Sequence, residues 1–89
     1  DNIINDNLGQ NYFLLGQYDK AREIYENLLA KAPSFPEPYY NYGLLMEKLG
    51  NREEALESMK KALSMKFSYL STITREEIET AISRLENAG

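Results

Sequence analysis

The sequence predicts an all-α fold in which antiparallel helix hairpins stack into an α-solenoid of about five helices. Within each period of the chain, apolar residues follow helical spacing, and a glycine in mid-period marks a chain reversal. With 89 residues, the chain makes one small domain, 1–89. We divide it into repeat one (2–35), repeat two (36–69) and a capping helix at about 75–88. Identical residues recur 34 positions apart, as in the pairs Asn7/Asn41, Gly9/Gly43, Gly16/Gly50 and Ala21/Ala55.

The first period predicts two helices on either side of Gly16. Apolar side chains that include Tyr12 precede this glycine, and Ala21 and Tyr25 follow it at helical spacing. Glycine suits the reversal because it takes the left-handed conformation at a helix C-terminus without strain. Pro33 then closes the hairpin, since proline cannot continue a helix.

The second period repeats this pattern around Gly50. Pro36 and Pro38 stand at the start of its first helix, where the missing N–H removes no hydrogen bond. Asn51 directly follows the glycine, and we expect it to cap the next helix while Glu54 reaches back to it.

Two further glycines, Gly9 and Gly43, fall inside the first helix of each pair. Each is disfavoured there by about 1 kcal/mol relative to alanine, so a packing reason is needed. We expect the first helix to cross the second so closely that only hydrogen fits, with the glycines facing Ala21 and Ala55.

After the second period the pattern changes. Phe67 stands where Pro33 stood, and a short polar connection leads to Thr74 and Glu77, which have the spacing of a capping box. The helix that follows is expected to cover the last apolar surface of the stack with one face and to meet water with the other. Its apolar face consists of Ile78, Ala81, Ile82 and Leu85.

Composition argues against several classes of function. The 14 acidic and 10 basic residues leave a net charge of −4, which gives no electrostatic reason to bind nucleic acid. The chain has no cysteine and no histidine, which removes disulfides, the usual zinc ligands and the commonest general base. We therefore expect no enzyme, no cofactor and no metal site. No apolar run approaches the roughly 20 residues that span a bilayer, so membrane insertion is not expected.

The first residues, Asp1 and Asn2, include neither an initiator methionine nor a signal-peptide pattern. We expect the chain to be a fragment of a larger protein. The absence of cysteine leaves the compartment open, with the cytoplasm slightly favoured over the bacterial periplasm.

In combination, these motifs resemble the tetratricopeptide repeat family over residues 2–69. The chain departs from the family pattern at Asn5, Arg52 and Phe67. The resemblance implies a right-handed superhelix in which the first helix of each repeat lines a concave groove. It also implies that the groove binds a peptide or a partner helix, as in a scaffold or adaptor. The matching motifs are Leu8-Gly9-x-x-Tyr12, Gly16-x-Tyr18-x-x-Ala21-x-x-x-Tyr25, Tyr42-Gly43-x-x-Met46 and Gly50-x-x-x-x-Ala55.

The family's register would direct two sets of side chains into the groove, namely Ile3, Asp6, Asn7, Gln10, Phe13 and Leu14 from repeat one, and Glu37, Tyr40, Asn41, Leu44, Glu47 and Lys48 from repeat two. We choose seven as the candidate binding residues: Asn7, Gln10, Phe13, Tyr40, Asn41, Leu44 and Lys48.

Within this set, Phe13, Tyr40 and Leu44 would make an apolar floor. The amides of Asn7, Gln10 and Asn41 could hydrogen-bond the main chain of an extended peptide. The alternative is that Phe13, Leu14 and Leu44 only pack one repeat against the next. For Leu14 we favour this packing role, whereas Tyr40 is expected to be exposed and to bind.

The best-known groove of the family holds a C-terminal carboxylate with lysine, arginine and asparagine. Here Asp6 and Gln10 replace a lysine and an asparagine of that pattern, and an aspartate would repel a carboxylate. We therefore reject this ligand.

A structural role remains as the alternative to peptide binding. Ile3, Ile4 and Leu8 are apolar residues near the N-terminal edge, where no earlier repeat covers them. Exposed apolar edges favour dimers, so the repeats could form a homodimer and serve as an assembly element.

Overall fold

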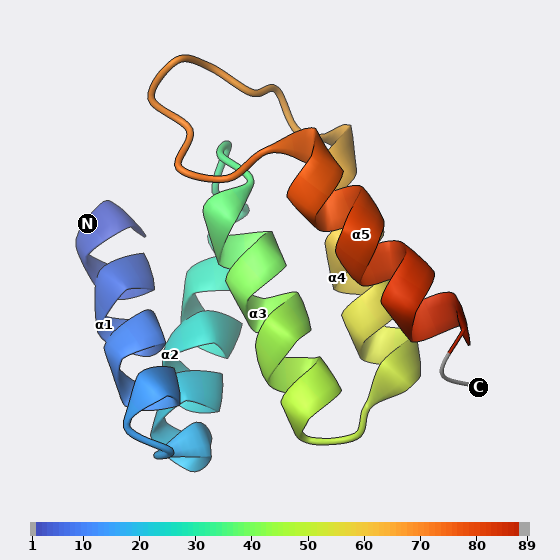
Figure 1. The fold of residues 1–89 in the computed structure, drawn as a ribbon. Coiled ribbons are helices and arrows are strands. Elements are labelled where there is room, and N and C mark those ends of the chain that lie inside the picture. The colour runs from blue at the N-terminus through green and yellow to red at the C-terminus, as the bar shows by residue number, and fades with distance from the viewer. Residues whose placement is uncertain (1, 88–89) are drawn as a thin grey trace.

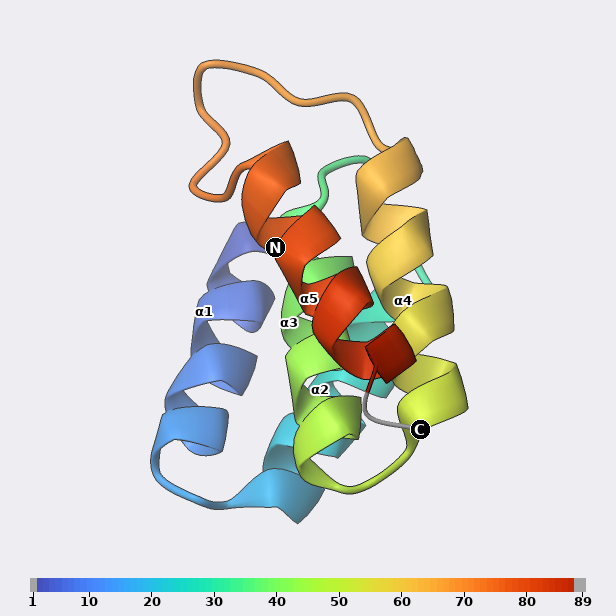
Figure 2. The same ribbon diagram turned by 45° about the vertical axis from the view of Figure 1, so that its right-hand side comes forward.

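The computed structural model describes residues 2–87 and confirms an all-α helical repeat fold within them. α1, α3 and α5 lie in one layer, and α2 and α4 lie in a second layer behind it (Figure 1, Figure 2). α1 and α2 fall within residues 2–35, and α3 and α4 within 36–69. Asp1 and Ala88, at the ends of the expected domain and capping helix, lie outside the described residues. The helices are α1 (Asn2–Leu14), α2 (Tyr18–Leu29), α3 (Glu37–Lys48), α4 (Arg52–Ser64) and α5 (Arg75–Asn87).

The two predicted glycine turns are confirmed. Gly16 and Gly50 have φ angles of 77° and 85°. The N–H groups that follow them reach back to close each helix end, from Gln17 to the Tyr12 carbonyl at 2.9 Å and from Asn51 to the Met46 carbonyl at 2.8 Å. These hydrogen bonds have the Schellman pattern, which satisfies carbonyls that a helix end leaves unpaired.

The turn after α2 uses alanine where the other two use glycine. Ala32 has a φ of 49° and donates its N–H to the Leu29 carbonyl at 3.0 Å. Pro33 follows directly and is buried. An L-residue with a side chain is strained in this left-handed region, and no sequence pattern predicts this conformation at Ala32.

The close approach at the two helical glycines is confirmed, but the expected neighbours are wrong. A Cβ at Gly9 would lie 2.7 Å from Cε2 of Tyr25, and one at Gly43 would lie 2.9 Å from Cε of Met59. The larger side chains one turn beyond Ala21 and Ala55 fill the space, because they are long enough to reach across the helix crossing.

α4 begins directly after Asn51, as predicted, but the capping bond expected from this side chain is wrong. Asn51 makes no capping bond, and its Nδ2 lies 3.6 Å from Sδ of Met46. Its backbone already belongs to the turn that ends α3, so the side chain is not directed at the start of α4.

At the start of α5, the main hydrogen bond of the predicted capping box is confirmed. Thr74 accepts the Glu77 N–H at 3.1 Å. Its hydroxyl also donates to Oε1 of Glu77 at 3.3 Å, in place of the reciprocal bond to the backbone.

The core runs through both layers and reaches α5. Ile78, Ala81 and Leu85 are buried, as the sequence predicts, and Ile82 is half-buried against them. The start of α5 is also tied to the end of α4, because Arg75 donates to the Leu63 carbonyl at 3.0 Å. The Arg75 guanidinium lies 4.7 Å from the centre of the Phe67 ring, which explains the aromatic residue at this position. The buried apolar residues of the two repeats are Ala21, Tyr25, Leu28, Tyr39, Leu45, Met46, Ala55, Met59 and Ala62.

Candidate functional site

α1 and α3 lie side by side and run in the same direction (Figure 1, Figure 2). Asn41 of α3 donates from Nδ2 to Oδ1 of Asp6 at 3.1 Å, and this buried hydrogen bond joins the two helices near the middle of the valley between them. Asp6 also accepts the Tyr25 hydroxyl at its carbonyl oxygen, at 3.1 Å. The valley is therefore fixed by buried polar contacts as well as by apolar packing.

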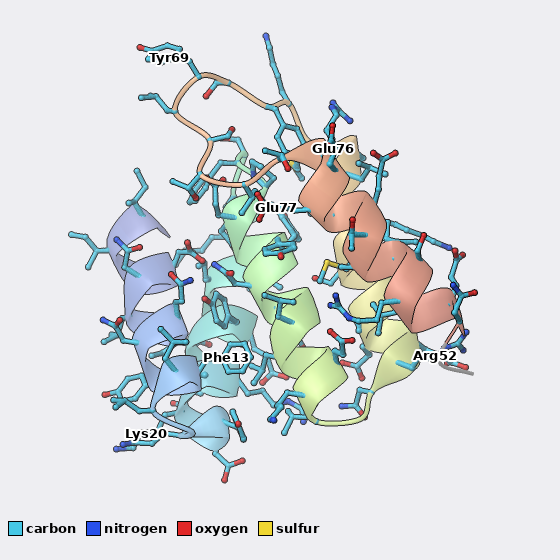
Figure 3. The ribbon with its side chains drawn as sticks, viewed as in Figure 1. Phe13, Lys20, Arg52, Tyr69, Glu76 and Glu77 are labelled. Carbon is cyan, nitrogen blue, oxygen red and sulfur yellow. The ribbon has the colours of Figure 1, made fainter. Side chains whose placement is uncertain are left out.

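An open depression of about 320 Å³ lies at the C-terminal end of this valley. We call it the Phe13 depression; its lining residues are Phe13, Leu44, Glu47 and Lys48. It brings together three of the seven candidate residues. Phe13 projects from α1 toward α3 (Figure 3), and its ring meets that of Tyr18 edge to face with centroids 5.8 Å apart. Phe13 thus both packs the hairpin and lines an accessible surface.

Glu47, on the rim of the Phe13 depression, is held by Arg84 of α5. The guanidinium donates from Nε to Oε2 and from Nη2 to Oε1, both at 2.7 Å. This two-bond contact lowers the pKa of Glu47 below its ordinary value. Because the ion pair links α3 to α5, the capping helix helps to position the rim. Sequence reasoning placed Glu47 in the groove but missed its partner.

Asn41 does not serve as the expected amide. It is only 6% exposed, and its Nδ2 is bonded to Asp6. The prediction that it presents its amide to a peptide is therefore wrong in this structure. The reason is the neighbouring carboxylate: burial raises the pKa of Asp6, and the Asn41 hydrogen bond partly offsets this. A buried carboxylate needs such a donor, and Asn41 supplies it.

Tyr40 is half-buried where we expected it to be exposed. α5 continues the layer beside α3, and Glu77 and Arg84 of α5 lie close enough to influence the Tyr40 hydroxyl. Burial raises the pKa of Tyr40, Glu77 adds a smaller contribution in the same direction, and Arg84 lowers it. Tyr40 therefore belongs to the contact between α3 and α5 more than to an open floor.

The remaining predicted residues lie at the surface. Asn7, Gln10 and Lys48 are exposed, so their polar groups are available to a ligand. Leu14 is 76% exposed, so the packing role that we favoured for it is wrong.

A second depression lies at the N-terminal end of the same valley and has a volume of about 290 Å³. We call it the acidic pocket; Asp6, Asn7, Glu37 and Thr72 line it together with the apolar side chains of Ile3, Phe35 and Leu70. The sequence placed Asn7 in the groove but did not predict that the connection before α5 folds over it.

A larger depression, about 740 Å³, lies on the other layer between α2 and α4. Tyr39, Tyr42, Lys60 and Lys61 are among its lining residues. Tyr42 donates to Glu54 at 3.4 Å across this surface. It contains none of the seven candidate residues. The sequence signal for this depression was that the tyrosines of α3 alternate between the two sides of the helix.

A two-layered array of helix hairpins with an open valley between α1 and α3 defines a helical repeat fold. A family model described as TPR repeat matches residues 9–50, and another described as Tetratricopeptide repeat matches residues 36–69. The chain belongs to the tetratricopeptide repeat family, whose members are typically non-catalytic protein-interaction modules. No curated protein matches the chain.

No helix within residues 2–87 combines the length and apolar character needed to cross a bilayer. In the same range, histidine, cysteine and carboxylate side chains do not gather in groups of three or more that could hold a metal ion.

Proposed function

We propose that the chain is a two-repeat binding module, with repeats 2–35 and 36–69 closed by α5, that holds a peptide or partner helix in the valley between α1 and α3. The observation that carries this proposal is the Phe13 depression. It places an aromatic ring, an aliphatic side chain and a lysine on one accessible surface. An apolar floor with a charged rim is the usual make-up of a peptide anchor site.

The contacts around this depression support a preformed site. Phe13 is held by Tyr18, and Glu47 is held by two hydrogen bonds from Arg84. Preformed walls reduce the ordering entropy that binding would otherwise cost. Lys48 is exposed beside them and gives the rim a positive charge. Gln10 and Asn7 lie farther along α1 and can hydrogen-bond the main chain of a bound segment.

A peptide selected from a random display library tests this proposal. Its affinity would be measured by fluorescence anisotropy for the wild type and for the double variant Leu44→Gln/Lys48→Glu. We expect at least a tenfold loss in the variant, because the floor becomes polar and the rim charge is reversed. Circular dichroism would verify that the variant stays helical.

The matched control is Leu56→Gln/Lys60→Glu, which makes the same two changes at the same spacing on α4. Leu56 is half-buried and Lys60 exposed, as are Leu44 and Lys48. This control should bind the peptide as the wild type does. Equal affinity in the groove variant, or a loss confined to the control, would contradict the proposal, and the second result would assign binding to the surface between α2 and α4.

A specific observation also supports self-association as a second candidate. Four large aliphatic side chains of α1, together with Leu15 directly after it, are exposed. This is a larger apolar surface than a single helix usually leaves to water. The five side chains are Ile3 (64%), Ile4 (63%), Leu8 (42%), Leu14 (76%) and Leu15 (69%).

Light scattering on a size-exclusion column, over about a hundredfold range of concentration, tests this candidate. A mass that rises to two chains, and returns to one chain in Leu14→Gln/Leu15→Gln, would support a homodimer through α1. A constant mass of one chain would contradict it and leave peptide binding unaffected.

A further inference from the structure

The acidic pocket holds a carboxylate whose hydrogen bonding is incomplete. Glu37, the first residue of α3, is 9% exposed. Its Oε2 accepts both the Thr72 N–H, at 2.7 Å, and the Thr72 hydroxyl, at 3.0 Å. Its Oε1 is buried, and none of the described residues forms a hydrogen bond with it. A buried carboxylate oxygen without a donor is costly, so the structure leaves an acceptor for a group from outside the chain.

The structural role of Glu37 does not explain why Oε1 is buried without a hydrogen-bond donor among the described residues. A carboxylate at the first position of a helix is favourable because of the helix dipole, and Thr72 fixes the connection 65–74 against it. Both roles are performed with Oε2 alone. They also hold the side chain rigid, so Oε1 cannot turn outward to water without breaking the two bonds to Thr72.

The charges around the pocket point to a cation. Asp6 is the second carboxylate of the lining, and none of the described residues that line the pocket is basic. Glu37 is close enough to contribute to the raised pKa of Asp6, although burial is the larger cause. Two acidic groups therefore share a half-enclosed space without a neutralising charge.

The shape of the pocket selects among cations. Ile3, Phe35 and Leu70 give it apolar walls, which suit the alkyl stem of a long basic side chain. A planar guanidinium has donors in a fixed fork that can reach two carboxylates at once, whereas an ammonium is a compact and strongly hydrated charge. A metal ion fits less well, because hard cations take six or more oxygen ligands.

We propose that the acidic pocket binds the guanidinium of an arginine side chain from the partner, with Oε1 of Glu37 and the carboxylate of Asp6 as acceptors. The inference deepens the proposed peptide-binding function and rests on it for the partner's identity. Seven residues separate Asp6 from Phe13 along α1, and Glu37 from Leu44 along α3, which is about 10 Å in each helix. This distance matches about three residues of extended chain. The partner segment should thus carry an arginine about three residues from an apolar anchor.

Capped tripeptides test the arginine site apart from the rest of the groove. Acetyl-Ala-Arg-Ala-amide would be titrated into the labelled protein at low salt, with the amide resonances of Glu37 and Thr72 as the readout. We expect saturable shifts at these amides. The same tripeptide with citrulline, which keeps the shape of arginine and lacks its charge, should bind at least tenfold more weakly, and the lysine tripeptide should also be weaker.

Variants of the two carboxylates complete the experiment. Glu37→Gln keeps an acceptor for Thr72, and Asp6→Asn keeps an acceptor for Asn41, so both should fold. Each should weaken the arginine tripeptide at least fivefold. Glu23→Gln, which removes one negative charge from the exposed surface of α2, should not change the affinity.

Three results would overturn the inference. They are equal binding of the arginine and citrulline tripeptides, equal binding of the arginine and lysine tripeptides, and unchanged affinity in Glu37→Gln. The variant Leu44→Gln/Lys48→Glu separates the two proposals, because it should weaken binding of the selected peptide at least tenfold without changing that of the arginine tripeptide. A selected peptide that needs the Phe13 depression but ignores Glu37 would leave the proposed function standing and remove the arginine site.

Discussion

Nε of Arg52, the first residue of α4, lies 2.6 Å from the carbonyl oxygen of Leu85 in the last turn of α5. Nη2 of the same guanidinium donates to the Glu86 carbonyl at 3.3 Å. Arg52 thereby satisfies two carbonyls that the end of α5 leaves unpaired and places a positive charge at the negative end of its dipole. Because Arg75 makes the corresponding contact to the end of α4, each helix of this pair begins with an arginine that caps the other. Figure 3 shows Arg52 beside the C-terminal end of α5.

Replacement of Arg52 should loosen α5 selectively. We expect Arg52→Ala to lower the free energy of unfolding by about 1 kcal/mol, since a hydrogen bond from a charged group is lost at a partly exposed site. Amide hydrogen exchange in the last turn of α5 should become faster. Arg22→Ala, which removes an exposed arginine paired with Glu26 inside α2, is the control and should leave exchange in α5 unchanged. Equal exchange in both variants would contradict the capping role.

The two helical glycines should respond differently to alanine. At Gly9 the new Cβ would meet the buried Tyr25 ring, whose hydroxyl is anchored to the Asp6 carbonyl. We expect Gly9→Ala to destabilise the fold by about 1–3 kcal/mol, the usual range for overpacking. Gly43→Ala meets the flexible Met59 side chain, which can move, so its effect should be small. Urea denaturation of the two variants measures this, and a larger loss at Gly43 would contradict it.

The strained alanine at the end of α2 predicts a stabilising change. Ala32→Gly should raise the free energy of unfolding by about 0.5–1 kcal/mol, because glycine takes a φ of 49° without a steric penalty. Ala30→Gly is the matched control two residues earlier, where φ is −62°. There glycine should lower stability, because it adds freedom to the unfolded chain and relieves no strain. Denaturation midpoints that move in the same direction in both variants would contradict the assignment of strain.

Asp6 gives the fold a stability that depends on pH. Its pKa is raised in the folded state above the ordinary 3.8, so the folded chain binds the proton more tightly than the unfolded chain. The stability from this group is therefore fully present below pH 3.8 and is lost as pH rises through the folded pKa. In Asp6→Asn this loss should vanish, so the variant should gain stability relative to the wild type as pH rises above 3.8. Asp19→Asn controls for the change of net charge, and urea titrations at several pH values give the comparison.

The ion pair between Glu47 and Arg84 should give the fold a stability that changes with pH in the opposite direction to that from Asp6. Because Arg84 lowers the pKa of Glu47, the contribution of this pair is present above pH 4.5 and is lost as pH falls through the folded pKa. A double-mutant cycle with Glu47→Gln and Arg84→Gln should give a coupling energy of about 0.5–1 kcal/mol at neutral pH, as expected for a well-formed pair at the surface. The coupling should decrease at high salt. A coupling that is unchanged by salt and by acid would contradict the ionic account.

Much of the fold followed from local patterns. The helical spacing around Tyr12 and Tyr25, the glycines at the reversals and the threonine before α5 all act within a few residues of the chain. The missing side-chain cap at Asn51 shows the limit of this reasoning, because the backbone of this residue also takes part in the turn that ends α3. The candidate site was less predictable. The sequence placed Phe13, Leu44 and Lys48 in one groove, and the structure brings these three together in the Phe13 depression. Asn41 and Tyr40 are less exposed than expected, because their neighbours in the fold come from distant segments of the chain.

The sequence by itself determined the 34-residue period, the helices and their two glycine turns, because each depends on short-range spacing and on backbone conformations that few residues adopt. Only the tertiary structure decided that Asn41 is bonded to Asp6, that Glu37 meets Thr72 and that Arg52 caps α5. These pairs are separated by 33 to 35 residues, and whether a polar side chain meets solvent or a partner is settled when the helices pack. The same packing leaves Oε1 of Glu37 buried at one end of the valley and Phe13 accessible at the other.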